Sequence, residues 1–472
     1  MKKRKIGAAL LCTVLMATML AVPASANSAQ TQWEGVDSTG AIVREGDCPI
    51  VVEKELLTFD IQEFPGNYYR ELDAYLAYSG KVTAEYTFYN PADYTVTATL
   101  LFPFGCEPMY AATEHHGKDT EKYDILVDSE AVEKTMRYTL SSGFDQFELD
   151  SDLALLHGDY VVDTFYALDL PVTKYVFMPS GVDTDTYGAA DAGFDMVRDD
   201  PERRIYFVDQ NGLHTQDDGD LRVHSGVENN EAITVYVIGQ DYAEFPQWKF
   251  YQDGGVEDGE EISGTMTLES REELSFRDLA LSKWNADSGV SEIDWYNAVV
   301  AMLTGSSDST GSNLHLWEFG SFDLSRYLMR WYEYEISIGP GERIVNTVTA
   351  PIYPSINSNW EPPIYEYTYL LSPAQTWAEF GTLDIRINSP FYMIESGSVL
   401  DVELTDSGYA AHLDGLPEGE LTFTLCSEQM TKIPANLGNA YPEALLIGAV
   451  ILIVAVVAVV VVVKRKNRKH SL

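Results

Sequence analysis

Cysteine is scarce in this chain, with four residues among 472. One of them, Cys12, lies in the apolar run near the N-terminus, which leaves Cys48, Cys106 and Cys426 for the rest of the chain. Three cysteines in so long a segment do not form a disulfide framework, and an odd count cannot be fully paired within the chain. A Cys48–Cys106 bridge and buried thiols are equally compatible with this count.

Basic residues are also few, since 31 lysines and arginines stand against 73 aspartates and glutamates. Residues 1–26 and 464–472 hold nine of the basic residues and none of the acidic ones. The part between them therefore has 22 basic and 73 acidic residues, a net charge of −51. Such a surface repels phosphate backbones, so no nucleic-acid partner is expected. Solubility at an anionic cell surface is the simplest role for this charge.

Motifs for catalysis are lacking as well. The sequence has no Gly-x-Ser-x-Gly nucleophile elbow, no His-Glu-x-x-His pair and no phosphate-binding glycine-rich loop. His115 and His116 come nearest to a metal-ligand cluster. Adjacent side chains on a strand point to opposite faces, which favours an exposed polar turn for this pair. No catalytic or cofactor-binding residue is predicted.

The N-terminal residues 1–26 have the features of a secretory signal peptide. A basic start precedes an apolar run from Ile6 to Val22, and the small residues Ala24 and Ala26 fit the subsites of a signal peptidase. Cleavage is therefore predicted after Ala26. Residues 27–47, which are polar and contain glycine, then form a leader.

The C-terminal end predicts a membrane anchor. Residues 444–463 are a run of twenty apolar residues, long enough as a helix to cross a hydrocarbon core of about 30 Å. The basic residues of 464–472 follow at once, and the positive-inside rule places them in the cytoplasm. A short linker, 432–443, precedes the span. The predicted location is the cell membrane, single-pass, with the N-terminal ectodomain outside.

The ectodomain has the alternation of β-structure. Val82, Ala84 and Tyr86 fall on one face of a strand, with Thr83 and Glu85 on the other. The predicted fold is mainly β, with two tandem β-sandwich domains. These domains cover residues 48–165 and 232–431. Strands of the first are predicted at 50–61, 81–90, 94–102, 123–127 and 131–140, with the second and third joined as an antiparallel pair.

Two segments depart from the strand pattern. Residues 166–231 are rich in Asp and Gly and are predicted to be a loop-rich connector between the sandwiches. Residues of about 268–331 are predicted to form a small helical insert. Its first helix would begin at a capping box of Ser270 and Glu273, its second at Ser291, and a third would cover 323–329.

The Asp/Gly-rich connector also holds the candidate metal ligands. Asp183 and Asp185 begin like a calcium loop, with carboxylates at alternate positions, but the later ligand positions are occupied by Tyr187 and Phe194. Asp183, Asp185, Asp191 and Asp195 are therefore the candidates for a noncanonical calcium site. Turns held by aspartate side chains are the alternative.

Aromatic residues supply the candidate ligand-binding positions. Exposed aromatic rings stack on sugars, and Trp317 and Trp360 lie in segments rich in Gly, Ser or Pro. Packing in the core or at a sheet edge is the alternative for both, because β-sandwiches use tryptophan and tyrosine heavily.

One segment has a family resemblance. Residues 81–105, KVTAEYTFYNPADYTVTATLLFPFG, contain a strand, an Asn-centred turn, a second strand and Phe-Pro. The segment resembles the opening of the vault/inter-alpha-trypsin (VIT) type of domain, and the chain is similar to uncharacterised bacterial single-pass surface proteins. VIT proteins usually also carry a von Willebrand type A domain, whose Asp-x-Ser-x-Ser metal run is lacking here. The resemblance implies a β-sandwich with a binding or structural role and transfers no site residues.

Together these features predict a non-enzymatic bacterial cell-surface membrane protein whose ectodomain binds an extracellular protein or a glycan. The alternative is a cell-surface hydrolase that acts on glycan or cell-wall material through carboxylates of the Asp/Gly-rich connector. No spacing in the sequence selects an acid or a base for that chemistry.

Overall fold

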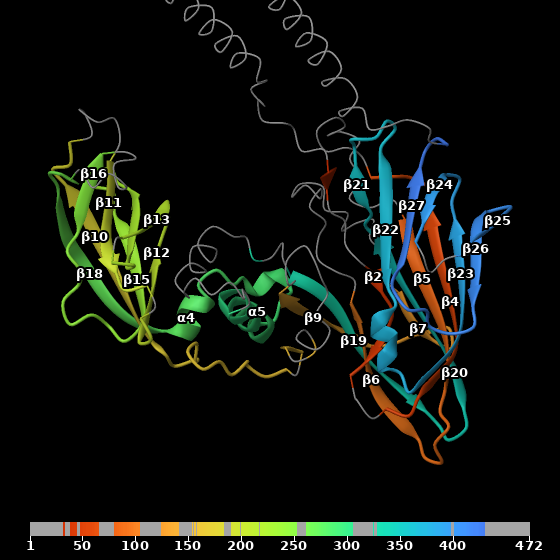
Figure 1. The fold of residues 1–472 in the computed structure, drawn as a ribbon. Helices are drawn as coiled ribbons and strands as arrows, with labels where there is room; N and C mark the ends of the chain where they lie inside the picture. The colour runs from red at the N-terminus through yellow and green to blue at the C-terminus, as the bar shows by residue number, and fades with distance from the viewer. Residues whose placement is uncertain are drawn as a thin grey trace, which may run out of the picture.

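The computed structural model describes the chain in segments. The described residues are 32–33, 38–44, 48–65, 80–103, 124–140, 153, 155–156, 158–183, 190–198, 200–216, 218–252, 261–304, 324, 328–397 and 401–429. Strands dominate these segments, which confirms the prediction of a mainly β chain. They gather in two β-rich units with short helices between them (Figure 1).

The first unit, called the large sandwich below, is made of three sheets around one apolar core. The widest sheet contains, in spatial order, β25 (Glu403–Thr405), β26 (Gly408–Leu413), β23 (Glu379–Asn388), β4 (Val51–Ile61), β5 (Gly80–Tyr89), β20 (Arg343–Ile352), β7 (Asp124–Val127) and β8 (Glu130–Ala131). The second contains β1 (Gln32–Trp33), β21 (Ser355–Asn357), β22 (Ile364–Leu370), β27 (Leu421–Cys426) and β24 (Tyr392–Ser396), with β2 (Ser38–Thr39) beside β22. The third contains β3 (Ile42–Val43), β6 (Val96–Pro103), β19 (Leu328–Ile338) and β9 (Lys134–Leu140).

The large sandwich is built from both halves of the chain. Strand β4 pairs in parallel with β23, β5 pairs with β20, and β6 pairs with β19. Phe59 and Phe423, which come from opposite ends of the sequence, pack edge to face at 5.1 Å in its core. The prediction of separate sandwiches at 48–165 and 232–431 is therefore wrong. Short connections had favoured pairing between neighbours in sequence, whereas here the apolar faces of distant strands complete each other.

The second unit, called the small sandwich, lies between β9 and β19 in the sequence. One of its sheets contains β12 (Arg203–Phe207), β15 (Ile233–Gly239), β10 (Pro171–Ser180) and β18 (Thr265–Ser275). The other contains β13 (Gly212–Thr215), β14 (Leu221–Gly226), β11 (Ala190–Met196), β16 (Lys249–Gln252) and β17 (Glu261–Ile262). Phe194 and Phe207 from the two sheets share its core. The loop-rich connector expected at 166–231 is thus incorrect, because five of these strands lie in it.

The helices connect the two units. They are α4 (Phe276–Ala280), the 3₁₀ turn η3 (Ala286–Ser288) and α5 (Glu292–Thr304). Their cluster takes in Val172 and Ile238 of the small sandwich, and α5 packs on β9 of the large one. A further 3₁₀ turn, η5 (Ser372–Thr376), follows β22.

Of the three predicted helices, only the second stands as placed. It begins after Ser291 as expected. The first begins later, because the capping box is formed by Ser275 and Asp278 and the residues before it belong to β18. The end of the third is wrong, since β19 begins at Leu328.

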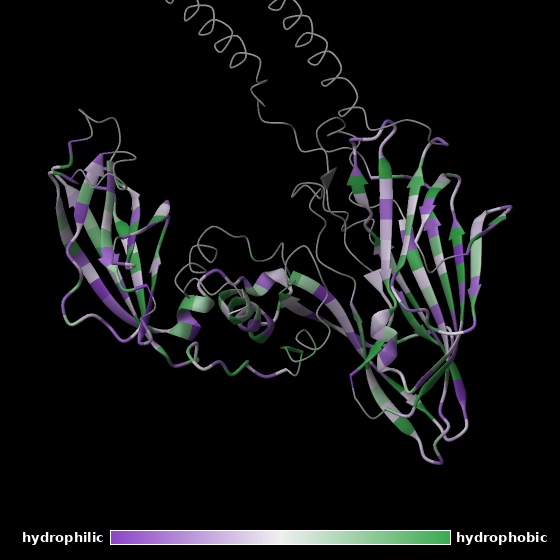
Figure 2. Ribbon diagram, in the orientation of Figure 1, coloured by the Kyte–Doolittle hydropathy of each residue, from purple (hydrophilic) through white to green (hydrophobic). Residues whose placement is uncertain are grey.

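The Asn90 turn joins two sheets and not two paired strands. β5 and β6 flank this turn as predicted, but they lie in different sheets, so the predicted antiparallel pair does not exist. Asn90 is fully buried, and its Nδ2 donates to the carbonyl oxygens of Tyr94, Ile338 and Gly339. Along the strands, hydrophilic and hydrophobic residues alternate (Figure 2). That alternation explains why strand positions were predicted better than their partners.

The predicted ends of the chain fall mostly outside the described residues. The signal peptide 1–26, the linker 432–443, the span 444–463 and the tail 464–472 all lie there. Within the described segments, no helix has the length and apolar character needed to cross a membrane. The expected leader 27–47 includes β1, β2 and β3, so part of it belongs to the large sandwich.

Candidate functional site

Asp195, one of the four candidate calcium ligands, is paired with cations. It lies on β11, where its carboxylate accepts from Arg222 Nε at 2.7 Å, from Arg222 Nη2 at 3.1 Å and from Lys249 Nζ at 3.0 Å. Partial burial acts to raise the pKa of Asp195, but Arg222 and Lys249 outweigh it and hold the pKa below its usual value. The carboxylate is therefore neutralised by the sheet itself.

The other candidates do not gather around Asp195. Asp191 is buried on the same strand, accepts from Asn211 Nδ2 at 3.1 Å and lies 3.8 Å from His224 Nδ1. Asp183 is exposed just after β10, and Asp185 lies outside the described residues. Among the described residues, no group of three or more His, Cys, Asp and Glu side chains could hold a metal ion.

The Asp195 pairs give a testable structural role. We expect Asp195→Asn to lower the free energy of unfolding of the small sandwich by about 1–2 kcal/mol, because the largely buried Arg222 would lose its carboxylate. The exposed Asp218→Asn is the matched control, with an expected change within about 0.5 kcal/mol. Urea unfolding of both variants provides the measurement. Equal midpoints for the two variants would refute the structural role of Asp195.

The candidate aromatic and cysteine positions are only partly described. Trp360 is half-buried in the turn between β21 and β22, whereas Trp317 lies outside the described residues. His115, His116 and Cys106 also lie outside them. Cys48 and Cys426 are buried.

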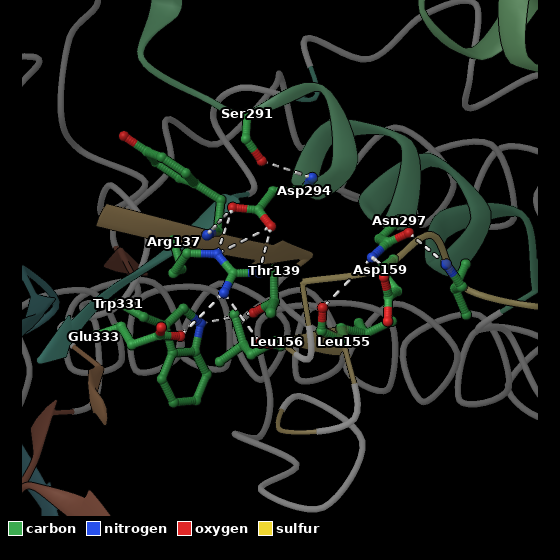
Figure 3. A network of polar contacts seen from close by, with 12 residues as sticks. Arg137, Thr139, Leu155, Leu156, Asp159, Ser291, Asp294, Asn297, Trp331 and Glu333 are labelled. Carbon is green, nitrogen blue, oxygen red and sulfur yellow. Dashed lines mark hydrogen bonds and ion pairs between the residues drawn. The ribbon is translucent and has the colours of Figure 1, made fainter. Parts of the chain in front are cut away.

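A buried network of charges lies where the helices meet the large sandwich (Figure 3). Arg137 on β9 donates through Nε and Nη2 to Asp294 on α5, with distances of 3.0–3.3 Å, and its Nη1 donates to Glu333 on β19 at 3.0 Å. Glu333 also accepts from Arg44 at 3.1 Å. The side chain of Asp294 is completely buried, and that of Arg137 is 12% exposed. The contact between α5 and the large sandwich, called the joint below, thus contains a row of alternating charges. The row is Arg44, Glu333, Arg137 and Asp294.

Hydrogen bonds to the backbone complete the joint. The amide of Tyr138 donates to Asp294 at 3.1 Å, and Arg137 Nη1 donates to the carbonyl of Leu156 at 3.1 Å. One turn further along α5, Asn297 Nδ2 donates to the carbonyl of Asp159 at 3.0 Å. Burial alone would lower the pKa of Arg137, but Asp294 and Glu333 raise it above its usual value. This network fixes α5 on β9.

A second buried carboxyl group lies in the core of the large sandwich. Glu55 on β4 is 2% exposed and faces Tyr86, its neighbour on β5. Tyr369 Oη donates to Glu55 Oε1 at 3.3 Å, and the two tyrosine hydroxyls are 3.5 Å apart. Burial raises the pKa of Glu55 to about 7, against the opposing hydrogen bonds from both tyrosines.

Neither Glu55 nor the Arg137–Asp294 pair was predicted from the sequence. In strict alternation from Val52, Lys54 and Leu56 would face inward and Glu55 outward. A β-bulge at Glu53 shifts the pattern, since Val52 pairs with Phe88 and Lys54 with Thr87. No residue type in β4 announces this bulge. The role of Asp294 could have been predicted in part. An acidic residue amid the apolar positions of α5 needs a cationic partner when it is buried.

Comparisons with known proteins identify no family for this chain. No family model matches the chain, and no curated protein matches it. One solved structure found is a proposed nutrient binding protein from Legionella pneumophila. It shares 8% identity, the match covers 84% of this chain and 72% of that one, and the TM-score is 0.35. At this TM-score the likeness does not establish a shared fold.

Proposed function

We propose that the chain is a non-enzymatic, single-pass protein of the bacterial cell surface whose ectodomain binds an extracellular protein or a glycan. Residues 444–463 anchor it, residues 464–472 lie in the cytoplasm, and the sandwiches lie outside. The resemblance of residues 81–105 to a VIT-type domain stays a prediction and agrees with this role.

The observation that supports a non-enzymatic role is that two carboxylates are paired with basic side chains. Asp195 is neutralised by Arg222 and Lys249, and Asp294 is neutralised by Arg137. A glycan hydrolase needs two carboxyl groups about 5–9.5 Å apart, one of them free to exchange a proton. Asp191 and Asp195 are four residues apart on one strand, a spacing of about 13 Å. This pair therefore does not support the alternative of a hydrolase.

The large sandwich would be the unit nearest the membrane. Its last strand, β27, ends at Cys426, and the described residues end at 429. Fifteen steps of extended chain from 429 to the first residue of the predicted span cover at most about 50 Å. The small sandwich is attached through β9 and β19 and offers a second surface to partners.

Removing the predicted anchor tests the location. We expect deletion of 444–472 to release the ectodomain into the medium, while the full chain stays with the membrane fraction, because the anchor provides the only predicted apolar span after signal cleavage. Quantitative immunoblotting of medium and membranes measures the partition. Protease added to intact cells is expected to remove the ectodomain epitope of the full chain and leave an epitope at 464–472 protected.

Two results would count against the proposal. Retention of the truncated chain in the membrane fraction would exclude 444–463 as the sole anchor. Turnover of glycan or peptidoglycan by the purified ectodomain, abolished by single Asp→Asn changes, would favour the hydrolase. As a control, Lys54→Gln on the surface of β4 is expected to leave the partition unchanged.

A further inference from the structure

A short N-terminal segment of the large sandwich contacts the tyrosines beside Glu55. This segment, Ser38–Val43, is called the strap. At its start β2 pairs with β22, and at its end β3 pairs with β6, so it joins two sheets. Trp377 Nε1 donates to the carbonyl of Ala41 at 3.1 Å, which fixes the middle of the strap.

The strap contacts the two tyrosines that surround Glu55. The amide of Ala41 donates to Tyr86 Oη at 3.1 Å. Gly40 lies so close to the hydroxyls of Tyr86 and Tyr369 that a Cβ atom at this position would clash with Tyr86. The strap, both hydroxyls and the carboxyl group of Glu55 therefore form one buried polar cluster in an apolar core.

No positive charge compensates Glu55 within the described residues around it. From β5 it is faced by Tyr86, from β22 by Tyr369 and from β23 by the apolar Leu383. The strap, β27 and η5 contain no charged residue. The other charged residues of β4, β5, β22 and β23 are all at least partly exposed to solvent: Glu53, Lys54, Asp60, Lys81, Glu85, Glu366, Glu379, Asp384 and Arg386. An ionised Glu55 would thus depend on two hydroxyl groups alone.

We propose that Glu55 carries a proton while the strap is closed, and that loss of this proton loosens the strap from Tyr86 and Tyr369. The device is a pH-sensitive latch at the N-terminal side of the large sandwich. It does not depend on the membrane anchor or on the identity of the binding partner.

The direction of the effect follows from proton linkage. Burial raises the pKa of Glu55 to about 7, while its ordinary value is 4.5. The closed strap therefore binds a proton that the open strap releases between these two values. The proton on Glu55 stabilises the closed strap fully below about pH 4.5. This stabilisation falls as the pH rises and is lost above about pH 7. Between pH 6 and pH 8 the open population is expected to rise about tenfold.

Hydrogen exchange in the full-length protein in detergent measures this opening. After correction for the intrinsic exchange rate, the protection factors of the strap amides are expected to fall about tenfold between pH 6 and pH 8. Glu55→Gln, which stays neutral, is expected to abolish the change. Glu366→Gln, an exposed control on β22, is expected to keep it.

A measurement on the wild-type protein tests the proposal even if the Glu55→Gln variant does not fold. The carboxyl carbon of Glu55, followed by NMR in the isotope-labelled full-length protein in detergent, is expected to titrate near pH 7. A midpoint near 4.5, or protection of the strap that does not change with pH, would overturn the proposal. So would the same pH dependence in folded Glu55→Gln.

Discussion

Replacing Asp294 by alanine is expected to lower the free energy of unfolding of the protein by about 3–5 kcal/mol. The carboxylate is completely buried and accepts hydrogen bonds from three donors, which are Arg137 Nε, Arg137 Nη2 and the amide of Tyr138. Its removal leaves a guanidinium that is largely buried with Glu333 as its remaining carboxylate. Glu333 reaches only Nη1 of Arg137, and a buried charge that has lost part of its compensation costs more than the pair itself contributes.

Glu292→Ala is the matched control for this experiment. Glu292 is on the same helix and pairs with Arg277, but both side chains are partly exposed. The expected cost is therefore at most about 1 kcal/mol. Urea titrations followed by tryptophan fluorescence measure both variants. Equal losses would show that the Asp294 network does not hold the joint.

A double variant separates charge from packing. In Arg137→Met with Asp294→Leu, both charges are removed and the apolar volume is largely kept. We expect most of the stability lost in Asp294→Ala to return, because no buried charge is left unpaired. If the double variant is as unstable as the single one, packing in this joint outweighs its electrostatics.

The second large effect concerns fragments of the chain. A fragment of residues 48–165, the first predicted domain, is expected to stay unfolded. It contains β4, β5 and β6 but lacks β19, β20 and β23, their partners in the large sandwich. Far-UV circular dichroism and amide NMR dispersion measure its fold.

The complementary chain keeps those partners. In it, a short Gly/Ser loop replaces residues 141–327, since Leu140 and Leu328 are directly paired neighbours about 5 Å apart. We expect this chain to fold cooperatively, with lower stability because Tyr138 and Leu140 lose their cover from the helices. A folded 48–165 fragment together with an unfolded complementary chain would contradict the nested fold.

Much of the secondary structure could be predicted from local pattern. β4, β5 and β6 lie within two residues of the ranges expected from alternation. Alternation determines which face of a strand is apolar, but it does not determine which strand covers that face. The parallel pair of β4 and β23 could not be predicted for this reason.

The surroundings of Asp195 and Glu55 could not be predicted for a related physical reason. Asp195 has the residue type of a calcium ligand, yet Arg222 and Lys249 reach it from neighbouring strands that the loop-rich interpretation did not contain. Glu55 was hidden by the bulge at Glu53, a backbone feature without a sequence signal of its own. Both cases depend on register, which only the assembled sheet supplies.

The nesting of one sandwich inside another also sets the order in which the protein can fold. Asn388 on β23 donates to Asp60 on β4 across 328 residues of chain. At a synthesis rate of about 5–20 residues per second, β4 waits roughly 15–60 s for this partner. The small sandwich, whose strands are contiguous in sequence, is complete first. Until β19 and β23 arrive, the apolar faces of β4 and β5 stay open, and this interval is when the chain most needs protection from aggregation.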